Sequence, residues 1–129
     1  MLSQKDQAIQ YALSDEFNIK RFKSMLLPQP NGCVEFAGAK WDDRDMYRAF
    51  AIKIITEYGY VYRNVKAHRF SFALANGFNA LPKSSKATNG KSDTKIINHI
   101  CNNKKCVEPT HLNVLTNREN TSVENRKQK

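Results

Sequence analysis

Hydrophobic positions change their spacing along the chain, and the change predicts where helices give way to strands. Two stretches with helical spacing come first, at residues 4–14 and 17–27. Pro28 and Pro30 end the second stretch, because proline cannot continue a helix. We therefore expect an N-terminal helical segment over residues 1–30.

Alternating apolar and polar positions follow and predict a small antiparallel sheet. Polar turns separate these runs, and Asn31-Gly32 is typical of the first of them. In the last run, Tyr60 and Tyr62 share one face while Arg63 points to the other. The expected strands lie at residues 33–37, 46–55 and 60–66.

A clear helix is expected at residues 67–77, where Phe70, Ala73 and Leu74 form an apolar stripe. Residues rich in Pro, Gly, Ser, Asn and Lys then predict a loop over residues 78–94. Two short strands and a capped final helix complete an α+β pattern, at residues 96–99, 112–116 and 117–125.

Cysteine and histidine gather between the two short strands, in the spacing Cys101-x4-Cys106-x4-His111. Thiolates and imidazoles are the ligands that structural zinc prefers, and a polar, lysine-rich loop gives cysteine no packing role. A tetrahedral site needs a fourth ligand. Cys33, the one other cysteine, is the first candidate, and His68 is the alternative.

The charge of the chain is +9, and nearly all of it lies in one segment. Residues 60–105 carry nine basic side chains and one acidic side chain, whereas residues 1–59 are balanced. Such a segment favours a polyanionic partner, and double-stranded DNA is the expected one. The candidate DNA-binding residues are Arg48, Lys53, Arg63, Lys66, Lys83 and Lys86.

Neither a membrane partner nor a secreted location is expected. No apolar run is long enough to span a bilayer, and no stretch is both amphipathic and basic. The chain opens without an apolar signal segment, so a cytoplasmic location is expected.

The order strand, metal loop, strand, helix also places His99 and Asn120 in positions that suit hydrolysis. A histidine ending one strand and an asparagine in the first turn of a facing helix can bracket a divalent ion and a water. The imidazole can take a proton from that water while the ion stabilises the leaving oxygen. Because only neutral imidazole acts as a base, activity is expected to fall at acid pH.

The run from His99 through Cys101, Cys106 and His111 to Asn120 closely resembles the His-Me finger (ββα-metal) nucleases. Among these it is most similar to zinc-containing phage HNH endonucleases and to His-Cys box homing endonucleases. Upstream, the stretches 31–38, 47–50 and 67–69 also resemble the N-terminal half of the family. The resemblance covers about residues 31–125 and implies a zinc-stapled nuclease domain over residues 31–129.

This resemblance implies roles for individual residues in phosphodiester hydrolysis that leaves a 5′ phosphate and a 3′ hydroxyl. His99 would be the general base, and Asn120 would hold a catalytic Mg2+ or another divalent cation. An arginine would support the scissile phosphate, with Arg63 and Arg69 as candidates. Asn98 stands where some relatives have a metal-binding aspartate. The implied structural Zn2+ ligands are Cys33, Cys101, Cys106 and His111.

Two other functions use the same residues. One is a zinc-stapled DNA-binding protein without catalysis, which would have no use for His99 and Asn120 together. The other is an RNase or a nuclease toxin with the same finger. A homodimer would let two such sites cut both strands, since one site cuts one strand. The resemblance also suggests a phage or mobile-element origin.

Overall fold

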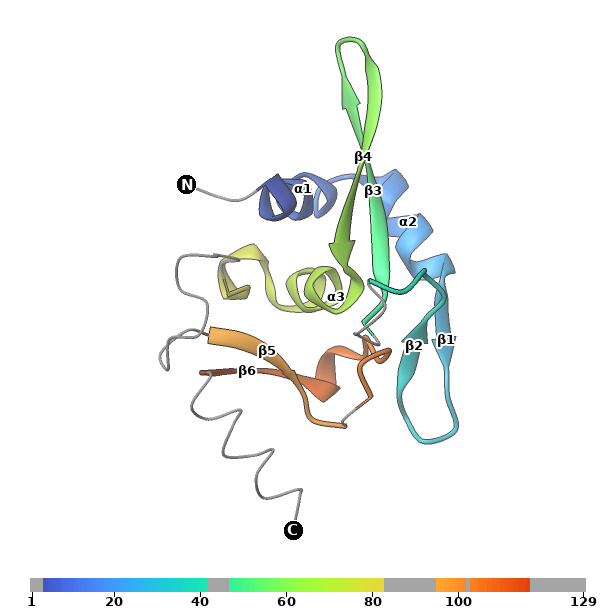
Figure 1. Cartoon of the computed structure of the whole chain (residues 1–129), viewed down its shortest axis with the longest axis vertical. Coiled ribbons are helices and arrows are strands. Elements are labelled where there is room, and N and C mark those ends of the chain that lie inside the picture. Colours follow the sequence, from blue (N-terminus) through green and yellow to red (C-terminus); the bar gives the residue numbers. More distant parts are fainter. Residues whose placement is uncertain (1–3, 42–46, 83–94, 102, 117–129) are drawn as a thin grey trace.

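The computed structural model describes residues 4–41, 47–82, 95–101 and 103–116 (Figure 1). The fold is α+β, as predicted, and the strands within these ranges form three separate two-stranded antiparallel sheets, β1–β2, β3–β4 and β5–β6. The helices are α1 (Gln4–Ala12), α2 (Glu16–Ser24) and α3 (Ala67–Asn76), with short 3-10 turns η1 (Phe78–Ala80) and η2 (Pro109–His111). The strands are β1 (Leu26–Pro28), β2 (Val34–Phe36), β3 (Ala49–Thr56), β4 (Gly59–Lys66), β5 (Lys95–His99) and β6 (Leu112–Thr116).

The second helix ends earlier than its apolar pattern predicted. α2 stops at Ser24, and residues 26–28 form β1, in which Leu26 pairs with Phe36 of β2. Here tertiary pairing overrides the helical spacing, and Pro28 is tolerated because β1 is an edge strand. The predicted loop over residues 78–94 also begins with the 3-10 turn η1. The final helix expected at residues 117–125 lies outside the described residues.

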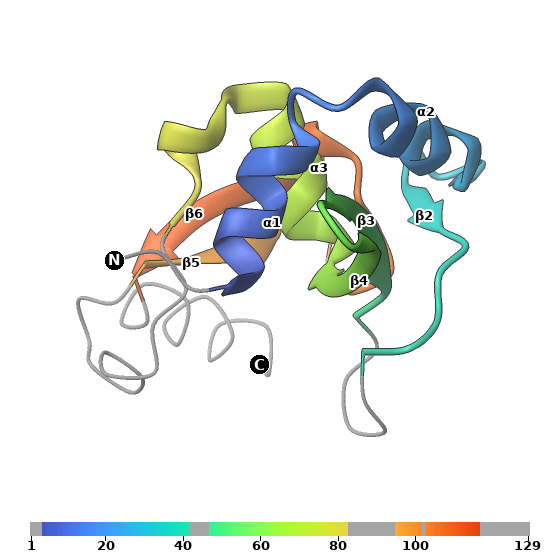
Figure 2. The ribbon, with the colours of Figure 1, turned by 90° about the horizontal axis from the view of Figure 1, so that it is seen from above.

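Four phenylalanines from four elements form the centre of the core. Phe22 of α2 lies 4.9 Å from Phe36 of β2, 5.1 Å from Phe50 of β3 and 4.8 Å from Phe70 of α3, measured between ring centroids. Ile9 of α1 is fully buried in the same cluster. The N-terminal helices therefore share one hydrophobic core with the strands, and α3 lies at its middle (Figure 1, Figure 2).

The β3–β4 hairpin is the longest ribbon of the fold and extends beyond the helices (Figure 1). Its eight residue pairs run from Ala49–Lys66 to Thr56–Gly59, and Gly59 makes the turn with a φ of 127°. Near the core its side chains alternate between buried and open faces, whereas at the tip both faces meet solvent. Its exposed large apolar and aromatic side chains are Ile55, Tyr58, Tyr60, Val61 and Tyr62.

Candidate metal site and active site

Cys33 reaches the Cys/His loop because β2 pairs with that loop. The amide of Val107 donates to the carbonyl of Val34 over 2.7 Å, and the amide of Phe36 donates to the carbonyl of Lys105 over 3.2 Å. Through these bonds the segment around Cys106 pairs with β2 as a short neighbouring strand. A cysteine far upstream in the sequence is thereby fixed beside the other predicted ligands.

The structure brings the four predicted zinc ligands together. The ligand atoms of Cys33, Cys101, Cys106 and His111 all lie within 4.8 Å of one another. Nδ1 of His111 is 3.5 Å from Sγ of Cys33 and 3.5 Å from Sγ of Cys106. Zinc bonds of about 2.3 Å to sulfur and about 2.0 Å to nitrogen, at tetrahedral angles, separate such atoms by about 3.5 Å. The donor set and its spacing therefore fit one zinc ion.

The protonation state of the Cys106 thiol depends on whether a cation is bound to the cluster. Burial, the largest cause, raises the pKa of Cys106 to about 12, and the neighbouring thiols of Cys33 and Cys101 add to the shift. Cys106 is therefore a neutral thiol at pH 7 without a metal. Zinc binds the thiolate, so loading the cluster must release this proton. The alternative ligand, His68, does not belong to the cluster.

His99 ends β5 immediately before the metal loop and is buried, with 6% of its surface exposed. Its Nε2 lies 3.1 Å from the carbonyl oxygen of Cys106. A carbonyl can only accept, so Nε2 carries the hydrogen and the lone pair of the neutral ring is on Nδ1. Burial lowers the pKa of His99 to about 4, with a smaller lowering from Lys104 and an opposing effect of the Cys106 bond. The ring is therefore neutral at pH 7.

Three rings pack together around this histidine. Tyr47 stacks on His68 with centroids 4.8 Å apart, and His68 lies 4.8 Å from His99. The ammonium groups of Lys66 and Lys104 lie 4.8 and 5.3 Å from the centre of the Tyr47 ring. Burial, followed by the charges of His99, Lys66 and Arg69, holds the pKa of His68 well below its usual range. We call Tyr47, His68 and His99 the ring group.

His68 is buried, but its Nδ1 has no hydrogen-bond partner in the part of the chain that the structure describes. Contacts between rings, not hydrogen bonds to Nδ1, hold it in place.

The predicted DNA-binding residues lie on several surfaces. The backbone of Arg48 pairs with that of Lys40 in an isolated β-bridge. Lys53 lies on the same face of the hairpin as Tyr62 and Lys66. Arg63 is exposed on the opposite side of the hairpin, because it pairs with Ile52. Of the other predicted residues, Asn98 donates to Asn113 over 3.2 Å. The positions of Lys83, Lys86 and Asn120 lie outside the described residues.

Arg69, one candidate for the scissile phosphate, holds the N-terminal helix to α3. Its Nη2 lies 2.9 Å from Oδ1 of Asp6 in α1 and donates to the carbonyl of Pro82 over 2.8 Å. The side chain of Asp6 is 2% exposed and that of Arg69 is 16% exposed. The Arg69 guanidinium is therefore already paired with a carboxylate and a carbonyl inside the protein.

Asp6→Asn is expected to destabilise the fold by about 3 kcal/mol, because removing one partner leaves the other charge buried without compensation. The free energy of unfolding in urea measures the loss. Glu16→Gln is the matched control, since both side chains of the Glu16–Lys20 pair are largely exposed and its loss should change the midpoint little. Equal midpoints for Asp6→Asn and the wild type would contradict a stabilising role for the Asp6–Arg69 pair.

Sequence reasoning assigned no role to Tyr47 and Lys104 beside His99. Tyr47 was noted only as part of a stretch that resembles the family, and Lys104 only as a basic residue of the metal loop. A tyrosine at the start of a strand gives no signal of its own. Contact with a histidine more than fifty positions away appears only when the fold brings β3, α3 and β5 together.

Residues 65–122 match a family model described as HNH endonuclease. The matched segment begins at the end of β4 and contains α3, the ring histidines, the metal loop, β5 and β6. It includes the position of Asn120 but not Cys33 or the N-terminal helices. No curated protein and no solved structure matches the chain significantly. Among the described residues, every helix is too short or too polar to cross a bilayer.

Proposed function

We propose that the chain is a metal-dependent endonuclease that cuts double-stranded DNA, because residues 65–122 match the HNH endonuclease family. The observation that carries the proposal is the geometry of His99. This histidine is fixed through Nε2 by the carbonyl of Cys106, is neutral at pH 7 and lies beside the cysteine and histidine cluster. A DNA-binding protein without catalysis would have no need of such a base.

His99 acts in this proposal as the general base. Nδ1 takes the proton of the attacking water, and the Cys106 carbonyl keeps the imidazole in the required tautomer and stabilises it as it becomes charged. The proposed ligand of the catalytic divalent cation, Mg2+ or a similar ion, is Asn120. When bound, this cation supplies stabilisation of the charge that develops on the leaving 3′ oxygen. The expected products carry a 5′ phosphate and a 3′ hydroxyl.

The cluster of Cys33, Cys101, Cys106 and His111 is proposed to hold a structural Zn2+. Its role is mechanical, because the loop between Cys101 and His111 also carries the carbonyl that fixes His99. Zinc would hold this loop against β2 through Cys33. The metal that stabilises the fold would thereby also orient the catalytic base.

Positive side chains around the ring group are proposed to hold DNA phosphates. Lys66 and Lys104 lie beside Tyr47, and we add Lys104 to the residues predicted from the sequence. Arg63 and Arg69 are retained as candidates for the scissile phosphate. Of the two, Arg63 is exposed, whereas Arg69 would have to share its charge with Asp6. The remaining proposed DNA contacts are Arg48, Lys53, Lys83 and Lys86.

We further propose the homing or phage HNH type of endonuclease, acting inside a cell, on the basis of the zinc ligands inserted after His99. One chain would then nick one strand, and cutting of both strands would need a homodimer. Double-strand cuts that rise with the square of protein concentration, while nicks rise linearly, would indicate such a dimer.

Supercoiled plasmid incubated with the protein and Mg2+ tests the proposal. We expect relaxed circles whose nicks T4 DNA ligase can seal, because ligase requires a 5′ phosphate and a 3′ hydroxyl. Plasmid that is bound but stays supercoiled with Mg2+, Mn2+ and Ni2+ would instead support a non-catalytic DNA-binding protein. Cleavage of a structured RNA but not of plasmid would support an RNase or a nuclease toxin.

A further inference from the structure

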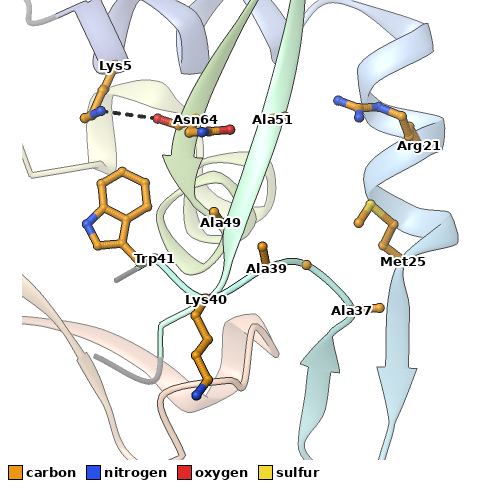
Figure 3. Close-up of a pocket in the computed structure, with 11 residues that line it drawn as sticks. Lys5, Arg21, Met25, Ala37, Ala39, Lys40, Trp41, Ala49, Ala51 and Asn64 are labelled. Carbon is orange, nitrogen blue, oxygen red and sulfur yellow. Dashed lines mark hydrogen bonds between the residues drawn. The ribbon is translucent and has the colours of Figure 1, made fainter. Parts of the chain in front are cut away.

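A cleft lies on one face of the β3–β4 hairpin (Figure 3), and none of its lining residues belongs to the metal cluster or the ring group. It has a volume of about 600 Å³, and α1, α2 and Trp41 border it. Its floor consists of small residues from β3 and from the segment after β2, Ala37, Gly38, Ala39, Ala49 and Ala51. Three basic side chains, Lys5, Arg21 and Lys40, are also part of its lining.

Large and small side chains alternate along β3, and the small ones form the floor of the cleft. Phe50 and Ile52 point into the core, so the intervening Ala49 and Ala51 face the cleft with short side chains. Gly38 brings the neighbouring segment close, because a Cβ at this position would collide with the carbonyl oxygen of Ala49. Because these residues are small, the cleft beside the hairpin stays open as a channel and is not filled by apolar side chains.

Positive charge borders the channel on both sides. Lys5 reaches it from α1, where Nζ donates to the carbonyl of Asn64 over 3.4 Å, and Arg21 reaches it from α2 on the opposite side (Figure 3). No acidic side chain of the described residues lines the channel. A bound anion would therefore meet cations from two helices without repulsion from the lining.

Arg21 is the cation of the cleft lining that is best placed to accept an anion. Its side chain is half-buried, and Nε and Nη2 have no hydrogen-bond partner in the described part of the chain. Its guanidinium lies 4.8, 5.8 and 5.9 Å from the centres of the Phe50, Phe17 and Tyr62 rings. Burying a charged group without a partner is costly, whereas guanidinium binds phosphate through strong, paired hydrogen bonds. A phosphate at this edge of the channel would compensate the charge.

The cleft shares two lining residues, Lys5 and Trp41, with a second cavity on the side of the ring group. Lys66 and Arg69 also line this second cavity. The ammonium of Lys66 lies 5.5 Å from the centre of the Trp41 ring and 4.8 Å from that of Tyr47. Since Tyr47 packs against His99, basic and aromatic side chains connect Arg21 to the proposed catalytic base.

We propose that this cleft binds the phosphate backbone of one strand of duplex DNA, which runs from Arg21 past Trp41 toward His99. The inference rests on the proposed endonuclease function and adds the path of the substrate to it. Lysine and arginine over a floor of alanine and glycine suit a sugar-phosphate chain. Such contacts position DNA without reading its sequence.

Binding of a fluorescein-labelled 20-base-pair duplex, followed by anisotropy from 50 to 200 mM NaCl without Mg2+, tests the path. Each lost phosphate contact lowers the slope of log K against log salt by about 0.9. For Arg21→Gln we therefore expect the ratio of wild-type to variant affinity to shrink about 3.5-fold across this range. Lys23→Gln is the matched control, because Lys23 is an exposed cation on the same helix and should leave the slope unchanged.

A wild-type slope for Arg21→Gln, or an equal decrease for Lys23→Gln, would overturn the inference. If Arg21→Gln does not fold, as judged by circular dichroism, the double variant Lys5→Gln/Lys40→Gln replaces it, with an expected loss of about two contacts. Trp41 gives a second readout, since it is the one tryptophan of the chain. Duplex DNA should reduce acrylamide quenching of Trp41 fluorescence, and unchanged quenching in the bound state would also overturn the inference.

These results are separable from the test of catalysis. A protein that cuts no plasmid but loses one counterion with Arg21→Gln would keep the DNA path and lose the endonuclease function. A protein that nicks plasmid while Arg21→Gln binds as the wild type does would keep the function and lose the path.

Discussion

His99→Ala should slow plasmid nicking by roughly 10²–10⁴-fold at pH 7 and leave DNA binding unchanged, as expected for loss of a general base. The single-turnover rate with Mg2+ and excess protein measures the chemical step without product release. His99 is not one of the zinc ligands, and its Nε2 meets only the Cys106 carbonyl in the hydrogen bonds described for it, so the variant should keep its zinc. A pure loss of rate is therefore the expected outcome.

Ile100→Ala is the local control for this experiment. Ile100 follows His99 directly, yet its side chain is 52% exposed, so its removal should preserve the rate, the zinc content and the affinity. Imidazole added to His99→Ala could enter the vacated space and restore part of the activity. Nicking by His99→Ala at the wild-type rate, with zinc content intact, would refute the assignment of His99 as the base.

The part of the fold from β5 to β6, which carries the proposed catalytic base, was predictable because its signals are local. Alternation of apolar residues before and after Cys101 and His111 placed β5 and β6, and the cysteine spacing indicated the metal loop. His99 emerged as a spare histidine beside that loop. Each step used residues near one another in the sequence, where spacing directly constrains geometry.

Contacts between distant segments were harder to predict. Cys33 could be named because it was the one cysteine left, but its route to the cluster depends on pairing of β2 with Lys105–Val107. A second pairing, that of β1 with β2, places Leu26 in a strand although its spacing predicted a helix. The spacing of apolar residues cannot indicate whether Leu26 lies in a helix or a strand, because a leucine packs equally well in both.

Roles of the basic residues were the least predictable. Total charge indicated DNA, but it could not separate Arg69, which is bound to Asp6, from Arg21, whose buried nitrogens lack a partner in the described residues. Arg69 lies in the first turn of α3 and Arg21 in the last turn of α2, and their helical positions do not distinguish their roles. The difference arises from what α1 and the hairpin place beside each guanidinium.

Removing zinc should unfold the protein, which is the largest effect on stability that we expect. Structural zinc in small finger domains contributes about 10–16 kcal/mol, comparable to or larger than the whole stability of a typical domain, about 5–15 kcal/mol. Freshly purified protein should contain one zinc per chain. A strong chelator should abolish its cooperative thermal transition, and added zinc should restore it.

Single ligand replacements sharpen this prediction. Cys106→Ser should prevent zinc binding and cooperative folding, because Cys106 is a buried ligand of the cluster. Cys33→Ser tests whether the loop holds zinc without β2, and we expect weaker zinc binding with a lower melting temperature. Thr110→Ala changes an exposed residue of the same loop and should behave as the wild type does.

The zinc experiment also bears on catalysis, because the Cys106 carbonyl fixes His99 and the Cys106 thiolate would bind the metal. Partial loss of zinc should therefore lower nicking activity in proportion to the metal lost, before any change in DNA affinity per folded molecule. A metal-free chain with an unchanged melting temperature would rule out the structural zinc. A metal-free chain that folds and still nicks DNA would show that the loop orients His99 unaided.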